Sequence, residues 1–169
     1  MAFLHLLTKE KKAARPAARP AKEKEAFQND PTPASAPAGR NRRILVVDDN
    51  QTVLKAFENK LKTDGFVVTT STNGASVASM AEQTQAELIV LDINFPPGGA
   101  IQWNGFTVMQ WLRRFPELER IPVILISGEA SSQHKEKALA EGAVAFFEKP
   151  VVYTELRGAM LSALGDSAS

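Results

Sequence analysis

Runs of four or five consecutive apolar residues recur along the chain, and between them apolar residues return at helical spacing. The runs predict strands buried on both faces, as in a parallel sheet, and the spaced positions predict amphipathic helices. The expected strands are 44–47, 66–71, 88–91, 122–126 and 143–147. The expected helices are 52–63, 75–83, 106–115, 132–141 and 153–164. Because strands and helices alternate, the pattern predicts an α/β fold with a doubly wound, five-stranded parallel sheet and five helices.

Polar residues follow four of the expected strands at the point where each strand ends. Asp48 and Asp49 follow the first strand, Asp92 the third, Ser127 the fourth and Lys149 the fifth. Parallel strands end at one edge of their sheet, and ligands of open α/β sheets bind at that edge. We therefore expect three carboxylates, one hydroxyl and one ammonium group to meet there.

This set of groups matches the needs of phosphoryl transfer to a carboxylate. Adjacent carboxylates repel each other unless a cation lies beside them, and hard oxygen ligands favour Mg²⁺. Asp92 can accept a phosphoryl group as an acyl phosphate, while Ser127 and Lys149 stabilise its oxygens. Each residue alone also fits a plain role as a helix cap, a turn residue or a solvated lysine. The functional interpretation rests on their joint arrival at one edge.

Four motifs resemble the receiver domain of bacterial two-component response regulators, in particular single-domain, chemotaxis-regulator-like proteins. They are Val46-Val47-Asp48-Asp49-Asn50, Val90-Leu91-Asp92, Ile126-Ser127-Gly128-Glu129-Ala130 and Phe147-Glu148-Lys149-Pro150. The resemblance covers about residues 43–165 and implies the flavodoxin-like strand order 2-1-3-4-5. It also implies a phosphorelay signalling protein, with no enzymatic activity beyond its own phosphorylation and dephosphorylation.

The resemblance assigns roles to individual residues. Asp92 would accept phosphate from a sensor histidine kinase or a His phosphotransfer protein. The implied ligands of Mg²⁺ are Asp48, Asp49, Asp92 and the backbone carbonyl of Asn94. Ser127 and Lys149 would bind the phosphoryl oxygens, and Ser127 and Phe146 would form the switch. The tuning positions would be Asn94, Glu129 and Trp103.

The switched surface would comprise helix 132–141, strand 143–147 and helix 153–164. Through it the protein would contact an unknown downstream protein, as a monomer or a weak dimer.

The connection after Asp92 departs from the family pattern. Asp92 is followed by Gly105 thirteen positions later, about five residues more than usual, and loop lengthening costs little. Trp103 in this connection should pack, because an indole in water wastes apolar surface. We expect it at the rim of the acidic site or the start of the next helix, where the loop would tune access to Asp92. The alternative is a tolerated surface insertion, and deleting Gly98 to Gln102 separates the two. Trp111 is expected to pack with Leu112 inside the helix interface.

Charge and composition divide the chain. Residues 1–43 hold ten Lys or Arg against four Asp or Glu, whereas residues 44–169 hold ten against fifteen. Residues 1–42 are rich in Ala and Pro and are expected to be a disordered basic tail, either a solvated leader or a docking peptide. Residues 43–165 form the expected domain, and 166–169 a frayed end.

The chain has no Cys and no long apolar run, which favours a cytoplasmic protein without a membrane segment. The acidic domain argues against nucleic-acid binding.

Two other functions remain open at this stage. The chain could be a phosphate-independent interaction module of receiver type, although the complete set of polar strand ends favours the phosphorylatable form. It could also be a hydrolase that uses an aspartyl-phosphate intermediate. Such an enzyme needs a substrate pocket and a cap domain, and no segment of the sequence is long enough for a cap.

Overall fold

A five-stranded parallel sheet forms the centre of the molecule. The structure, a computed structural model, describes residues 41–96, 102–128 and 132–165. The strands are β1 (Arg43–Val47), β2 (Val67–Ser71), β3 (Leu88–Asp92), β4 (Val123–Ser127) and β5 (Ala145–Glu148). They lie in the order β2-β1-β3-β4-β5, and every neighbouring pair is parallel. The flavodoxin-like, doubly wound fold predicted from the sequence is therefore confirmed.

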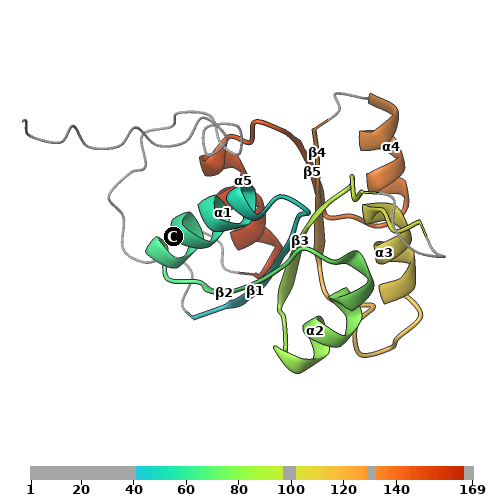
Figure 1. Ribbon diagram of the computed structural model, residues 1–169, viewed down its shortest axis with the longest axis horizontal. Coiled ribbons are helices and arrows are strands. Elements are labelled where there is room, and N and C mark those ends of the chain that lie inside the picture. The colour runs from blue at the N-terminus through green and yellow to red at the C-terminus, as the bar shows by residue number, and fades with distance from the viewer. Residues whose placement is uncertain (1–40, 97–101, 129–131, 166–169) are drawn as a thin grey trace, which may run out of the picture.

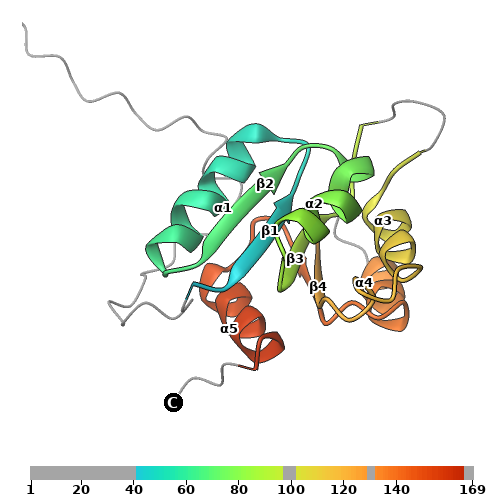
Figure 2. The ribbon, with the colours of Figure 1, turned by 90° about the horizontal axis from the view of Figure 1, so that it is seen from below.

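Helices cover both faces of this sheet. The helices are α1 (Gln51–Thr63), α2 (Val77–Gln83), α3 (Gly105–Leu112), α4 (Ser132–Ala140) and α5 (Tyr153–Ala163). Helices α1 and α5 lie on one face, and α2, α3 and α4 lie on the other (Figures 1 and 2). The apolar strand residues alternate between the two cores: Ile44 and Val46 pack under α1 and α5, whereas Leu45 and Val47 pack on the opposite side. Strands buried on both faces explain the continuous apolar runs in the sequence.

Three element boundaries differ from the expected ones by more than one residue. The expected helix 75–83 begins with a short 3-10 turn, η2 (Gly74–Ser76), before α2. Helix α3 ends at Leu112, not at position 115, because Pro116 disfavours helical backbone at the residue before it. Strand β5 begins at Ala145, because Ala143 closes the turn after α4, with its N–H bonded to the carbonyl of Ala138.

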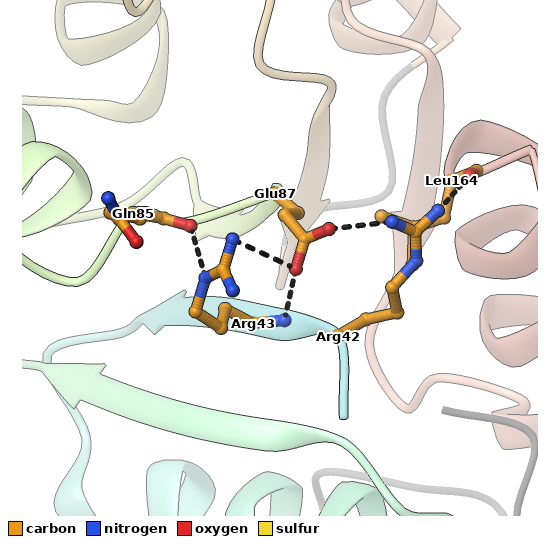
Figure 3. Close-up of polar contacts among 5 residues, drawn as sticks. All are labelled: Arg42, Arg43, Gln85, Glu87 and Leu164. Carbon is orange, nitrogen blue, oxygen red and sulfur yellow. Dashed lines mark hydrogen bonds and ion pairs between the residues drawn. The ribbon is translucent and has the colours of Figure 1, made fainter. Parts of the chain in front are cut away.

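A polar cluster lies where β1 and β3 begin, at the opposite end of these strands from the aspartates. Figure 3 shows its five residues. Glu87, just before β3, accepts the backbone N–H of Arg43 at 2.9 Å and the guanidinium of Arg42 at 2.6 Å. Arg42 also donates to the carbonyl of Leu164 after α5, and Arg43 donates to the carbonyl of Gln85 at 2.7 Å. The cluster thus ties the start of β1 to the start of β3 and to the end of α5.

Replacing Glu87 with Gln should lower the free energy of unfolding by about 1 kcal/mol at neutral pH, since charge-assisted hydrogen bonds to Arg42 and Arg43 are weakened. The backbone N–H of Arg43 is the main cause of a lowered pKa for Glu87, with the two guanidinium groups adding to it. The Glu87 contribution is therefore complete above the unfolded pKa and is lost as the pH falls through the lower folded pKa.

Urea unfolding of wild type and Glu87→Gln between neutral pH and pH 3 measures this contribution. Glu82→Gln, at an exposed position of α2, is the matched control and should change little. A difference between Glu87→Gln and wild type that stays constant across this pH range would contradict the assignment.

Candidate functional site

Three aspartates converge where β1 and β3 end. Val47 and Leu91 are register partners, so Asp48 and Asp92 leave neighbouring strands side by side. Asp48 is 3% exposed and Asp92 is 4% exposed, while Asp49 faces solvent. Each of the three offers a carboxylate oxygen, and these oxygens all lie within 4.8 Å of one another. The convergence of carboxylates predicted from the strand ends is confirmed.

Lys149 supplies the positive charge of the cluster. Its Nζ lies 2.6 Å from Oδ2 of Asp48 and 3.3 Å from Oδ1 of Asp92. The backbone N–H of Lys149 donates to the carbonyl of Ser127 at 2.8 Å, which fixes the segment after β5 against the end of β4. A cis peptide bond joins Lys149 to Pro150. Lys149 follows the edge strand β5, and its ammonium group lies between the two buried carboxylates of Asp48 and Asp92.

The electrostatic balance of the cluster is set by burial. The pKa of Asp92 is raised to about 6: burial is the largest cause, the ammonium of Lys149 opposes it, and the carboxylates of Asp48 and Asp49 add to it. Burial also opposes the charged form of Lys149, but the carboxylates of Asp92 and Asp48 outweigh burial and raise the pKa of Lys149 above its ordinary value. The site therefore carries more negative charge than a single lysine neutralises.

The carboxylates suit a hard divalent cation. Oδ1 of Asp92 is buried and accepts no hydrogen bond from the described residues, although the ammonium of Lys149 lies near it. Asp49 presents a solvent-facing carboxylate within reach of the same point. Asp48 accepts the backbone N–H of Asn50 at 2.9 Å, and Asn50 in turn caps α1. A buried carboxylate oxygen with spare acceptor capacity beside two more carboxylates is the donor set that Mg²⁺ prefers.

Ser127 and Phe146 lie on the two strands next to this cluster. Ser127 is fully buried at the end of β4, one residue beyond Ile126, which is the register partner of Asp92. Phe146 pairs in register with Leu125 and packs partly buried against the core under α2, α3 and α4. Because side chains alternate along a strand, Ser127 and Phe146 face the same side of the sheet. Glu129, a predicted tuning residue, lies outside the described residues.

A surface pocket opens beside the acidic cluster. It lies between the start of α1 and the segment after β5, and its lining includes Asp48, Asp49, Val53, Gly128 and Pro150. A reacting group can approach the carboxylates from this side.

The two ends of the long connection after β3 come together, while residues 97–101 between them lie outside the described residues. The N–H of Gly105 donates to the carbonyl of Ile93 at 2.9 Å. Trp103 is partly buried against the core and contacts Trp111 edge to face, with ring centroids 6.3 Å apart. The expectation that the Trp103 side chain packs is confirmed, and its ring contact lies with Trp111 in the last turn of α3.

One prediction about this region is wrong, and one close contact was not predicted. Trp111 was expected inside the helix interface with Leu112, but it is 40% exposed whereas Leu112 is buried. Its ring lies between those of Trp103 and Phe115, along the surface of α3. Sequence reasoning also missed the close approach of Gly105 to Asp92: a Cβ on Gly105 would lie 2.7 Å from the backbone oxygen of Asp92. The only sequence signal is a glycine where α3 begins, a position that Asn104 already caps.

Comparisons with known proteins agree with this geometry. The family model described as the response regulator receiver domain matches residues 44–161. The polar-differentiation response regulator DivK of Brucella anthropi is 27% identical over 126 residues, which cover 75% of this chain and 98% of that protein. The transcriptional regulatory protein PrrA of Mycobacterium leprae is 36% identical over 114 residues, but the match covers 68% of this chain and only 46% of PrrA.

Solved structures show the same fold. A crystal structure of a response regulator from Desulfuromonas acetoxidans superimposes with a TM-score of 0.65 at 27% identity, covering 73% of this chain and 97% of that one. Chemotaxis protein CheY4 of Vibrio cholerae gives a TM-score of 0.64 at 22% identity, covering 72% and 98%, which supports the fold alone. Among the described residues, no helix has both the length and the apolar character needed to cross a bilayer.

The family match covers nearly all of the sheet and helices and every residue of the acidic cluster. Receiver domains are two-component signalling modules, not enzymes, and membership implies a histidine kinase as partner. The aspartate cluster is typical of the magnesium site of a receiver and is consistent with a phosphoacceptor site. The chain therefore belongs to the response regulator receiver domain family.

Proposed function

We propose that Asp92 is the phosphoacceptor of a two-component phosphorelay. The observation that carries the proposal is a buried carboxylate held 3.3 Å from the ammonium of Lys149 and grouped with the carboxylates of Asp48 and Asp49. Phosphate donors of the right class are a sensor histidine kinase or a His phosphotransfer protein. The pocket beside α1 opens at Asp48, Asp49 and Lys149, which are grouped with Asp92.

The proposed reaction transfers a phosphoryl group from a phosphohistidine to Asp92. A carboxylate oxygen of Asp92 attacks the phosphorus of a phosphohistidine, a P–O bond forms, and the P–N bond to the imidazole breaks. The imidazole leaves with the electron pair and takes up a proton from solvent. Lys149 and Ser127 offer an ammonium group and a hydroxyl to the transferred oxygens, where charge develops.

A bound magnesium ion would supply further positive charge for the phosphoryl oxygens. The residues proposed to hold it are Asp48, Asp49, Asp92 and the backbone carbonyl of Asn94. Asp48 is hydrogen-bonded to Lys149 at 2.6 Å, so Asp49 and Asp92 retain more free acceptor capacity than Asp48.

We also propose that phosphorylation changes the surface formed by α4, β5 and α5. Ser127 would move toward the phosphoryl group, and Phe146 on the same side of the sheet would fill the space that it leaves. Phosphorylation shifts such an equilibrium only as far as the two states differ in their contacts with the phosphoryl group. Phe146 has no hydroxyl, so its contribution would be packing. The downstream partner is proposed to be a protein that binds this surface of a monomer or a weak dimer.

Intact-mass spectrometry after incubation with acetyl phosphate and MgCl₂ tests the proposal. Wild type should gain one phosphate, whereas Asp92→Asn, which keeps the size of the side chain but loses the nucleophilic oxygen, should gain none. Excess EDTA should abolish labelling of wild type. The amide NMR spectrum with beryllofluoride should change at α4, β5 and α5. Labelling of Asp92→Asn, or labelling of wild type that EDTA leaves unchanged, would sink the assignment.

A further inference from the structure

The base of the long connection after β3 is held at two points beside Asp92. The N–H of Ile93 donates to the carbonyl of Ile126 at 2.8 Å, and the carbonyl of Ile93 accepts the N–H of Gly105 at 2.9 Å. The first bond continues the pairing of β3 with β4, and the second joins the two ends of the connection. The backbone immediately after Asp92 is therefore fixed on its strand side.

Two aromatic residues hold the other side of the same backbone. Phe95 and Trp103 both pack partly buried on the core, and both lie over Gly74 of η2. A Cβ on Gly74 would lie 3.3 Å from Cβ of Trp103 and 3.7 Å from Cδ2 of Phe95. Because glycine has no Cβ, position 74 leaves room for Phe95 and Trp103, which come from opposite ends of the connection, to pack side by side.

The ring of Trp111 in α3 supports the side chain of Trp103. Its ring meets the ring of Trp111 edge to face at an interplanar angle of 87°, and the guanidinium of Arg114 lies over Trp111 at 5.1 Å. Aromatic pairs in this arrangement favour one orientation beyond what buried area alone provides. The Trp103 side chain is thus confined between Gly74 and α3.

Asn94 lies between the two anchored residues Ile93 and Phe95, and its own side chain is exposed. We propose that Trp103 is a positioning residue for the magnesium site: by confining the stem of the connection with Phe95, it holds the backbone of Asn94 beside Asp92. This inference rests on the proposed function, in which the carbonyl of Asn94 is a ligand. It assigns to the long connection a role in metal affinity that needs no contact between Trp103 and the ion.

Isothermal titration calorimetry of Mg²⁺ tests the inference on the full chain. Trp103→Ala should weaken Mg²⁺ binding by about tenfold, the lower end of what residues behind a ligand contribute. Trp103→Phe keeps an aromatic side chain that can pack beside Trp111 of α3 and should restore most of the affinity. Trp111→Ala removes only the ring that supports Trp103 and should weaken Mg²⁺ binding less than Trp103→Ala does.

A second variant perturbs the stem without removing an aromatic residue. Gly74→Ala places a methyl group 3.2 Å from Cγ2 of Val108 and 3.3 Å from Cβ of Trp103, so both neighbours must give way by a few tenths of an ångström. It should weaken Mg²⁺ binding in the same direction as Trp103→Ala, while thermal unfolding monitored in EDTA reports the general cost of each substitution.

Three outcomes separate this inference from the proposed function. Weaker Mg²⁺ binding in Trp103→Ala and Gly74→Ala, recovery in Trp103→Phe and a smaller loss in Trp111→Ala would support it. Unchanged affinity in Trp103→Ala, or no recovery in Trp103→Phe, would overturn the positioning role while phosphorylation of wild type at Asp92 still stands. A wild type that neither binds Mg²⁺ nor accepts phosphate would overturn both.

Discussion

Gly105→Ala is expected to lower the free energy of unfolding by about 2–4 kcal/mol and to impair phosphorylation of Asp92. The added methyl group would lie 2.7 Å from the backbone oxygen of Asp92 and 2.9 Å from Cα of Ile93. These are backbone atoms, which cannot turn aside as a flexible side chain can. Relief therefore requires the start of α3 to move away from the end of β3, which carries the proposed phosphoacceptor.

Urea unfolding and acetyl phosphate labelling of the same preparation measure both effects of Gly105→Ala. Gly158→Ala is the matched control, because Gly158 lies within α5 and a Cβ there would meet nothing within 4 Å. Alanine in a helix interior should stabilise the protein by about 0.5–1 kcal/mol relative to glycine. Wild-type stability together with wild-type labelling in Gly105→Ala would show that the helix start is not held against Asp92 in solution.

Lys149→Met is expected to slow phosphorylation of Asp92 by about 10²-fold, as removal of one preorganised charge from a reacting centre typically does. The methionine keeps an unbranched chain of similar length but removes the ammonium group from its positions 2.6 Å from Asp48 and 3.3 Å from Asp92. Binding of Mg²⁺ should be retained or strengthened, because the three carboxylates remain and the competing cation is gone. Phosphorylation is therefore expected to slow without any loss of Mg²⁺ affinity.

Rates of labelling by acetyl phosphate and calorimetric titration with Mg²⁺ check this prediction. Lys55→Met, at an exposed position of α1, is the control for loss of a positive charge and should alter neither quantity appreciably. Circular dichroism at the assay temperature verifies that Lys149→Met is folded. Labelling of folded Lys149→Met at the wild-type rate would remove Lys149 from the mechanism.

The sheet could be predicted from the sequence because its strands are buried on both faces. Such strands appear as unbroken apolar runs, and Leu88 to Leu91 is the clearest of them. The site followed from the same logic, since parallel strands bring their carboxyl ends to one edge. That argument placed Asp48 near Asp92 without specifying that Lys149 pairs more closely with Asp48 than with Asp92.

Features that depend on distant segments could not be predicted. The Arg42–Glu87–Leu164 contacts join three parts of the chain whose charges carry no local signal of pairing. Trp111 has the spacing of an inward-facing residue, yet α3 is short and its buried side is filled by Val108, Met109 and Leu112. A helical period tells which positions share a side, but the width of the covered stripe depends on the neighbouring elements.

The placement of α5 has a consequence for synthesis of the protein on the ribosome. Leu156 and Met160 of α5 belong to the same core cluster as Ile124 and Ile126 of β4, on the sheet face that α5 shares with α1. During translation this face stays incompletely covered until the last helix has emerged, and exposed apolar surface of this kind attracts chaperones and promotes aggregation. A nascent chain that ends just after Lys149 would carry every proposed site residue and would still lack the helix that keeps its sheet folded.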